Sequence, residues 1–549
     1  MIPAQRALIF GLVFTAAAFC QAAGDAGIPV TNELVIAKCG ACHTRDEHGI
    51  MQRISWERST PEGWQEALKR MIVLDGVTIT PPEARTLVGY LSTSHGLAPE
   101  EARPVMYDAE RRIPDEDSIP YKIRNACTKC HSFARALSWR RSADDWKVFI
   151  DAHAAQFQVP HPEEIVAYLT KAAPLHTPAW DAWSAQNTKP PNITGRWLLT
   201  ASLPGRGKYF GQIEVEAAGD DDYNTHAVLT SVNDGAELLR VGRSVVFGGY
   251  AWRGRSQGAN AGEQKPDDPN NQTREALWIA PDQSMAEGRW FWGHYQEFGF
   301  NVKWRRPSKN PTLLLLDRAS FKTGSQANRV RLIGDRFPVG ATPADLNFGS
   351  GVTVKRVISN TVTEIDAEVD VAADAAIGRR DVTAFGSALS GAIAIYDRVD
   401  YVKVVPESSL AAFGDPTHPR GYQQFEAVGY QRGPDGRLHT PDDLDLGPLD
   451  PGDLTWSVQV FHEDDEVNKN VVGDVSATGF FTPAAQNPNA NFDVWVTATA
   501  KDEKNKNGRP LTGKGYLVVT VPSYTFRGHR YVRDLDHWID DGPATPGGH

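Results

Sequence analysis

The cysteines are the residues of this 549-residue chain whose spacing points most directly to chemistry. Four of the five lie in two Cys-x-x-Cys-His motifs, at 39–43 and 127–131. Two thiols one helical turn apart can add to the two vinyl groups of one porphyrin, and the adjacent histidine can then bind its iron. We therefore predict two covalently bound haem c groups, held by Cys39, Cys42 and His43 in one motif and by Cys127, Cys130 and His131 in the other.

Paired cysteines also occur in thioredoxin-like redox centres, zinc sites and disulfides. A redox pair does not require the histidine that follows each motif here. Zinc ribbons rarely separate their cysteine pairs by some 85 residues, as this chain does. The haem reading is therefore favoured over the other three.

An internal repeat follows the two motifs and predicts the sixth iron ligands. In each copy a helix carries a tryptophan and, seven residues later, a methionine or a histidine, so both side chains share one helix face. We expect Met71 to ligate the first iron and His153 the second. The matching segments are Ser55–Ser59 with Ser138–Ser142, and Trp64–Met71 with Trp146–His153.

Other residues compete for these two positions. Met106 is the rival for the first iron and His161 for the second, with His48, His95 and His176 as weaker candidates. With Met71 and His153 bound, the first haem is His/Met and the second His/His. Because methionine raises the potential and a second imidazole lowers it, we expect electrons to enter at the second haem and leave from the first. Two filled axial positions also argue against catalysis at iron.

The first 22 residues resemble a secretory signal peptide. One arginine precedes an apolar stretch, from Ala7 to Phe19, which ends in small residues. Cleavage near Ala22 would remove Cys20 and deliver the chain to the periplasm. A lipoprotein anchored at Cys20 is the alternative, but the bulky Phe19 disfavours it. No later segment is apolar for long enough to span a membrane, so no integral membrane segment is expected.

Composition indicates a folded protein of several domains. Apolar residues make up 41% and charged residues 23% of the chain, close to the values of globular domains. The formal charge is −11, with 57 Lys plus Arg against 68 Asp plus Glu. Nucleic acid and anionic membranes are therefore poor candidate partners.

The secondary structure that the sequence predicts changes along the chain, from helices around the two motifs to strands beyond them. Helical periodicity and the repeat predict two all-α cytochrome c modules, at 23–108 and 109–185. Short alternating strands separated by turn residues then predict all-β domains. We expect a barrel-like domain at 186–336 and two immunoglobulin-like sandwiches at 337–428 and 429–549.

This order of domains, with the two motifs and the Trp64/Met71 and Trp146/His153 repeat, closely resembles the α subunit of bacterial quinohaemoprotein amine dehydrogenase. The resemblance implies a periplasmic αβγ complex that converts primary amines to aldehydes and ammonia. It places a cysteine tryptophylquinone on the small γ subunit, beside a propeller-like β subunit. The haems of the α subunit would pass electrons to a soluble cytochrome c or a cupredoxin.

The cysteine count agrees with a quinone that lies on another chain. A cysteine tryptophylquinone needs a cysteine thioether, and every cysteine beyond the signal segment is assigned to haem. We therefore expect no catalytic residue on this chain. Two other classes stay open at this stage: a dihaem peroxidase-like enzyme, and a non-enzymatic dihaem electron-transfer protein whose β-domains are binding modules.

Overall fold

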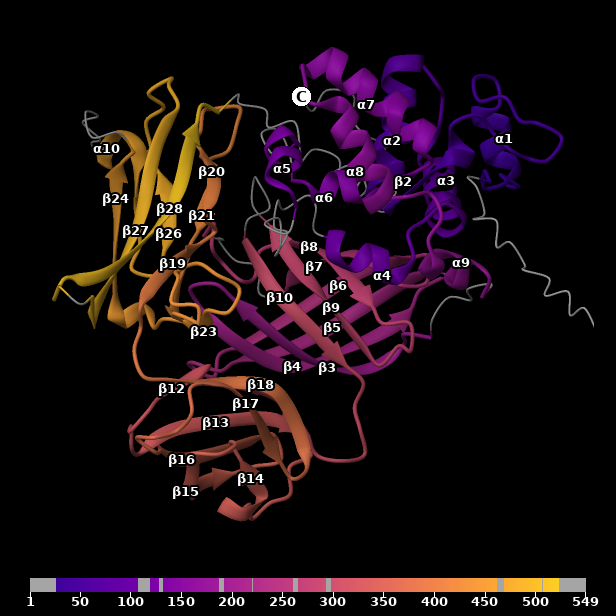
Figure 1. The fold of residues 1–549 in the computed structure, drawn as a ribbon. Coiled ribbons are helices and arrows are strands. Elements are labelled where there is room, and N and C mark those ends of the chain that lie inside the picture. Colours follow the sequence, from indigo (N-terminus) through magenta and orange to yellow (C-terminus); the bar gives the residue numbers. More distant parts are fainter. Residues whose placement is uncertain are drawn as a thin grey trace, which may run out of the picture.

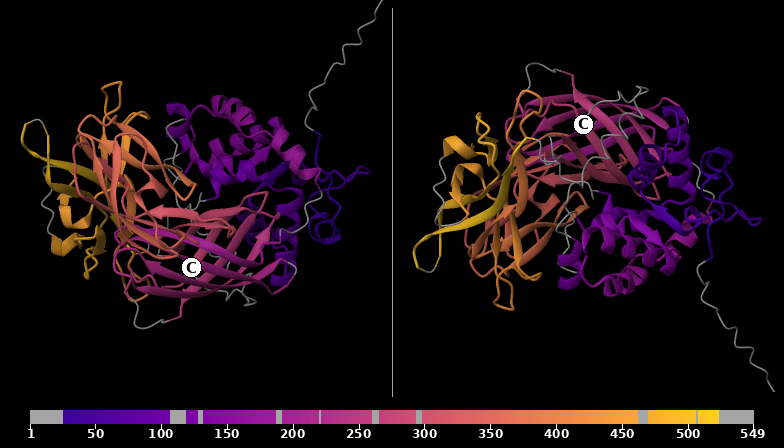
Figure 2. Two further views of the ribbon diagram at one scale, coloured as in Figure 1. Left: turned by 90° about the horizontal axis from the view of Figure 1, so that it is seen from below. Right: turned by 90° about the horizontal axis from the view of Figure 1, so that it is seen from above.

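The computed structural model describes residues 26–106, 119–127, 132–186, 192–219, 221–259, 265–292, 298–461, 469–505 and 507–522. A helical region packs against a closed β-barrel, and two further β-domains lie beside and below the barrel in Figure 1. The two views of Figure 2 show the helical region on one side of the molecule and the last β-domain on the other. The predicted fold class is thereby confirmed. The predicted signal peptide, Cys130 and His131 lie outside the described residues.

The first helical module is organised around one long helix. Thr60 caps its N-terminus by accepting a hydrogen bond from the Gly63 amide, and Gly76, with φ of 68°, ends it in the left-handed conformation. Apolar residues on its inner face, Trp64 and Leu68, join the core of this module. Its helices are α1 (Glu33–Cys39), α2 (Pro61–Asp75), α3 (Pro81–Ser94) and α4 (Pro99–Ala102).

The second module repeats this design. Ser142 caps its long helix by accepting from the Asp145 amide, and Gln158 ends that helix in the left-handed region, with φ of 52°. Trp146 and Ile150 belong to a separate small core. The helices are α5 (Tyr121–Cys127), α6 (Ala134–Leu137), α7 (Ala143–Phe157) and α8 (Pro162–Ala172), and α9 (Pro178–Ser184) follows them.

A two-stranded antiparallel ribbon joins the two modules. Strand β1 (Glu57–Ser59) comes from the first copy of the repeat and β2 (Trp139–Arg141) from the second. In their register Glu57 pairs with Arg141 and Ser59 with Trp139. The duplicated segments therefore face each other directly, and the two modules form one unit.

The barrel is an eight-stranded antiparallel sheet in which each strand pairs with the next strand along the chain. The last strand also pairs with the first, which closes the barrel. Its centre is packed with fully buried tryptophans: Trp197, Trp252, Trp290 and Trp304. The strands are β3 (Gly195–Leu203), β4 (Gly207–Ala217), β5 (Asp222–Ser231), β6 (Glu237–Phe247), β7 (Ala251–Gly258), β8 (Thr273–Ile279), β9 (Met285–Trp292) and β10 (Phe298–Arg305).

The next domain is a sandwich of two four-stranded sheets around one core. One sheet has the order β11-β13-β16-β15 and the other β12-β18-β17-β14. The strands are β11 (Thr312–Leu316), β12 (Ser320–Lys322), β13 (Asn328–Asp335), β14 (Leu346–Asn347), β15 (Val352–Asn360), β16 (Glu364–Val371), β17 (Gly378–Ala384) and β18 (Ser387–Tyr396).

The last domain packs three sheets around another core, with the orders β19-β22-β23, β20-β28-β27-β24 and β21-β26-β25. Its elements are β19 (Tyr401–Val405), β20 (Ser408–Ala412), β21 (Gln423–Gln424), β22 (Glu426–Gln431), β23 (Leu444–Pro448), β24 (Leu454–Val460), α10 (Lys469–Val472), β25 (Gly473–Val475), β26 (Phe480–Pro483), β27 (Phe492–Lys504) and β28 (Pro510–Thr520). The immunoglobulin-like identity of these two domains stays a prediction.

Two predicted domain boundaries are wrong. The boundary placed between residues 336 and 337 falls after β13, which pairs with β16 and shares a core with it through Val330 and Ile365. The barrel itself ends with β10. The boundary placed between 428 and 429 falls inside β22. In both cases strand pairing and core packing, and not local composition, decide which strands belong together.

Buried polar contacts hold the first module on the barrel. Glu62 near the start of α2 forms an ion pair with Arg253 of β7, and both side chains are at least nine-tenths buried. The Tyr250 hydroxyl donates to the Leu97 carbonyl at 2.9 Å, and Trp278 Nε1 donates to the Pro99 carbonyl at 2.9 Å. The barrel therefore fixes the position of the module. Within the ranges given above, no helix is long and apolar enough to cross a membrane.

Candidate haem sites

The first Cys-x-x-Cys-His motif begins at the last residue of α1. Cys39 is half-buried against the core of the first module, whereas Cys42 is exposed. The two thiols are not joined in a disulfide. Burial, and secondarily the neighbouring Cys42, raises the pKa of the Cys39 thiol above its ordinary value. Both thiols are thus available for thioether bonds to one porphyrin.

A backbone carbonyl orients the histidine of this motif. His43 Nδ1 lies 3.0 Å from the Gln52 carbonyl oxygen. Because a carbonyl only accepts hydrogen bonds, Nδ1 carries the proton and Nε2 keeps its lone pair. An imidazole that binds iron through Nε2 needs its proton on Nδ1, and a hydrogen bond from Nδ1 also fixes the orientation of the ring.

Hydrogen bonds link the end of α2 that carries Met71 to the end of α1. The Met71 carbonyl accepts from the Val77 amide at 3.2 Å, and the next residue, Thr78, accepts from Lys38 Nζ at 3.0 Å. Lys38 directly precedes Cys39. Met71 itself is half-buried. The candidate ligand and the attachment site are therefore held at the same end of the module.

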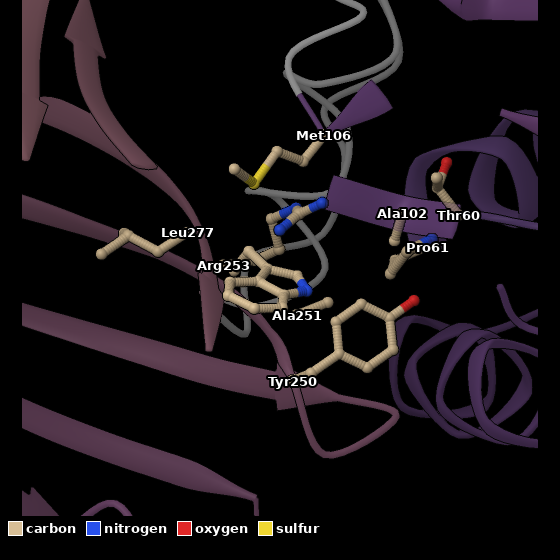
Figure 3. A pocket seen from close by; sticks show the side chains of 9 residues that line it. Thr60, Pro61, Ala102, Met106, Tyr250, Ala251, Arg253 and Leu277 are labelled. Atoms are coloured by element: carbon tan, nitrogen blue, oxygen red, sulfur yellow. The ribbon is translucent and has the colours of Figure 1, made fainter. Parts of the chain in front are cut away.

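The rival Met106 lies at the opposite end of α2. It lines a small pocket between the first module and the barrel, together with Thr60 and Pro61 of the module and Trp278 of the barrel. Figure 3 shows this pocket from close by. Ten residues of helix separate Pro61 from Met71, a rise of about 15 Å. Met106 thus packs against the barrel, away from the helix end linked to Cys39.

The second motif begins at the last residue of α5. Cys127 is half-buried and packs against the core of the second module, together with Phe149 and Tyr168. The rest of the motif is not described, so the second site is known from Cys127 and from the helices around it.

His153 lies on α7 between two aromatic rings of the same helix. Its imidazole stacks on Phe149, with ring centroids 5.0 Å apart, and contacts Phe157 at 4.9 Å. Burial lowers its pKa, and the positive charges of Arg135 and Arg70 lower it further. A neutral imidazole is the form that binds iron.

The other histidines lie in different surroundings. The side chain of His161 is 54% exposed and lies 3.6 Å from Glu164. His95 is fully buried beside Trp64, and burial lowers its pKa to about 4. His48 is exposed, and His176 lies 2.6 Å from the Ala26 carbonyl oxygen.

Met71 and His153 occupy the same place in two helices of equal length. Each stands eleven residues beyond the N-cap, Thr60 or Ser142, and five residues before the left-handed residue that ends the helix. The sequence repeat therefore corresponds to a repeat in three dimensions.

The residues of the first site fit a covalent porphyrin. The module holds two unpaired thiols and an oriented imidazole, and at the end of its long helix α2 apolar side chains face solvent. Val73 and Leu74, which follow Met71, are 68% and 75% exposed, and Phe157 at the matching end of α7 is 40% exposed. Large apolar groups are rarely left uncovered in clusters, so a flat apolar group beside them agrees with the pattern.

Sequence reasoning missed the polar network between the modules. Glu101 accepts from Arg58 at 2.7 and 3.0 Å, and Arg140 lies 3.4 Å away. Burial alone raises the pKa of the Glu101 carboxyl, but the hydrogen bonds and charge of Arg58 outweigh it and lower the pKa to about 2. The arginines of the two repeat segments, Arg58 in the first and Arg140 in the second, were the available signal.

Fold and sites together define a class: a multidomain protein in which a duplicated helical module with haem-attachment motifs is mounted on a β-barrel and two further β-domains. Four family models match the chain in this order. Their descriptions are quinohemoprotein amine dehydrogenase A, alpha subunit, haem binding (residues 30–168), and alpha-subunit domains II (190–307), III (310–397) and IV (402–528). The chain belongs to the family of quinohemoprotein amine dehydrogenase alpha subunits.

Comparison with curated proteins gave no significant match. Among solved structures, a redesigned β-barrel shares 12% identity and covers 21% of this chain and 92% of its own, with a TM-score of 0.18. A de novo designed fluorescence-activating β-barrel shares 16% identity over 21% of this chain and 93% of its own, with a TM-score of 0.17. Surface layer protein SbsC, domains 1–6, shares 11% over 80% of each chain, with a TM-score of 0.16.

Proposed function

We propose that this chain is the dihaem electron-transfer subunit of a periplasmic amine dehydrogenase complex. The observation that carries the proposal is the structural equivalence of Met71 and His153, each on the long helix of a module that contains a haem-attachment motif. A residue able to bind iron at the same position of both modules provides each haem with a sixth ligand. With these side chains bound to iron, the two haems would supply one-electron transfer, and no coordination position would stay open for a substrate.

Each side chain then has a defined task. Cys39 and Cys42 anchor the first haem and Cys127 and Cys130 the second, as one-electron carriers. His43 with Met71, and His131 with His153, ligate the two irons. The Gln52 carbonyl holds the His43 proton on Nδ1, so that Nε2 keeps the lone pair that would bind the iron.

Membership in the family supports the remaining parts of the proposal. Primary amines are oxidised to aldehyde and ammonia by a cysteine tryptophylquinone on a small partner subunit, next to a propeller-like subunit. This chain takes the electrons and delivers them to a soluble cytochrome c or cupredoxin. Its export signal and covalent haem agree with a periplasmic location.

Ligand variants of the full chain, produced with haem attachment, test the assignment. We expect Met71→Ala to abolish the methionine–iron charge-transfer band and to lower the potential of one haem. His153→Ala should raise the potential of the other haem, because an imidazole ligand is lost. Met106→Ala and His161→Ala are the matched controls and should leave both potentials unchanged. Loss of the band in Met106→Ala would assign the ligand to that residue instead.

Native purification tests the complex. A small polypeptide that stains for a quinone and travels with this chain is the expected result. Peroxide turnover by the isolated chain would indicate a dihaem peroxidase instead, and co-purification without any quinone-bearing polypeptide would indicate an electron-transfer protein with β binding modules.

A further inference from the structure

We propose that the contact between Trp64 and Trp139 carries the electronic coupling between the two cytochrome modules. The inference rests on the proposed function, because it requires two redox groups that exchange electrons within the chain. It adds a route through named side chains, which neither the haem motifs nor the family assignment provides.

The two indoles meet across the boundary between the modules. Trp64 belongs to α2 and Trp139 to β2, and their ring centroids are 5.7 Å apart in an edge-to-face arrangement with an interplanar angle of 63°. Trp64 is 3% exposed, and its Nε1 donates to the His95 carbonyl at 2.9 Å. The ring on the first-module side is therefore held in one orientation.

A glycine makes this close approach possible. A Cβ added at Gly63 would lie 1.9 Å from Ser59 Oγ of β1 and 3.2 Å from Cζ2 of Trp139, both tighter than ordinary contact. The third position beyond the N-cap is Gly63 in α2 but Asp145 in α7, although the two helices match in length and in the position of their tryptophan. The duplicated design thus departs from symmetry at the point where the Trp139 ring rests on α2.

Arg141 extends the contact into the second module. Its guanidinium carbon lies 4.7 Å from the Trp139 ring centroid and 4.7 Å from that of Phe149. Ion pairs with Glu57 and Asp145 fix the guanidinium, whose side chain is 3% exposed. A cation held between two aromatic faces is a rigid link, because both faces attract it.

The series ends at a proposed iron ligand. Phe149 stacks on His153 with centroids 5.0 Å apart, and at the other end Trp64 stands two helical turns before Met71 on α2. Electron tunnelling weakens most steeply across gaps between atoms that do not touch. From Trp64 to His153 each group contacts the next, and covalently bonded helix joins Trp64 to Met71, so this route is favoured. One iron loses an electron and the other gains it, and no bond forms, no bond breaks and no proton moves.

Trp139→Leu in the full haem-loaded chain tests the route. After flash reduction, the redistribution of the electron between the haems is followed at wavelengths where the two spectra differ. We expect a several-fold fall in this rate with unchanged haem content and unchanged midpoint potentials. Trp56→Leu is the matched control, since Trp56 is the equivalent residue of the first copy and packs against that module's own core; it should leave the rate unchanged.

Trp139→Phe keeps a ring at the contact and should restore most of the rate, which a purely structural role would not require. Phe149→Leu, at the far end of the series, should slow the transfer in the same way and serves if Trp139→Leu fails to fold. An unchanged rate in both Trp139→Leu and Phe149→Leu would overturn the inference and leave the proposed function intact. Absence of any electron exchange in the wild-type chain would count against the proposed function itself.

Discussion

At the scale of single residues, the unit formed by the two modules depends on a buried carboxylate. Glu101 accepts hydrogen bonds from Arg58, from Thr177 Oγ1 at 2.8 Å and from the Ala98 amide at 2.8 Å. Arg140 of the second module approaches the same carboxyl group. One carboxylate of the first module thus pairs with an arginine from each repeat. Removing one partner of such a buried ion pair strongly destabilises the fold, because the other charge stays buried without a countercharge.

Glu101→Gln should lower the free energy of unfolding at pH 7 by about 3 kcal/mol, because it leaves Arg58 buried without its countercharge. The pKa of Glu101 is about 2 in the folded chain against an ordinary value of 4.5. A depressed pKa stabilises the fold above pH 4.5, and this contribution is lost as the pH falls toward 2. The difference between wild type and variant should therefore shrink over that interval.

Urea unfolding followed by tryptophan fluorescence at several pH values measures this effect. Glu100→Gln, at the exposed neighbouring position, is the control and should behave like the wild type. A Glu101→Gln variant that is destabilised equally at pH 7 and at pH 2.5 would show that the charge is not responsible.

At the scale of elements, the docking of α2 on the barrel depends on the Glu62–Arg253 pair. Either Glu62→Gln or Arg253→Met alone should cost about 3 kcal/mol in the free energy of unfolding, since each leaves one buried polar partner unsatisfied. The double variant should cost clearly less than the sum. Chemical denaturation of all three variants completes the double-mutant cycle.

A more exposed contact on the same face is the control for this cycle. Arg103 pairs with Glu287 of β9 at 2.6 Å, but its side chain is 50% exposed. Arg103→Met should therefore cost less than about 1 kcal/mol. Equal costs for the two pairs would mean that burial does not decide the strength of the docking.

The elements that sequence predicts best are those with local signals. The repeated Trp64/Met71 and Trp146/His153 spacing is such a signal, because it predicts a helix on which each candidate ligand shares a face with its tryptophan. The pairing of β13 with β16 has no local signal, which is why the boundary near residue 336 was misplaced. The Glu62–Arg253 contact joins residues 191 positions apart, and one sequence contains no information on such pairs beyond their charge.

At the scale of the whole molecule, the described part of the chain has five separate hydrophobic cores. The core of the second module contains only residues between 119 and 173. The core of the first module also includes barrel residues, among them Phe247, Tyr250 and Trp278. The barrel interior and the two last domains each have a core of their own. We therefore expect the loss of the second haem to destabilise only the second module. Loss of the first haem should destabilise both the first module and the barrel.

Calorimetry of haem-attachment variants tests this expectation. Thermal unfolding should show more than one transition, because separate cores do not unfold as one unit. Cys127→Ser with Cys130→Ser should lower only the transition of the second module. Cys39→Ser with Cys42→Ser should also lower that of the barrel, whose outer wall completes the first core. A single transition that shifts as a whole in both variants would contradict this division.

The ribbon between β1 and β2 has one more consequence. Residues 57, 58 and 59 match 140, 141 and 142 in the repeat, and they pair with 141, 140 and 139, while the Ser142 amide donates to the Trp56 carbonyl. Residue 57 thus faces the equivalent of residue 58, and residue 58 faces the equivalent of residue 57. Reciprocal pairing of this kind is typical of a two-fold homodimer interface. The duplicated half thus contains, within one polypeptide, the subunit contact of a symmetric dimer. Each copy covers a strand edge that would otherwise be open.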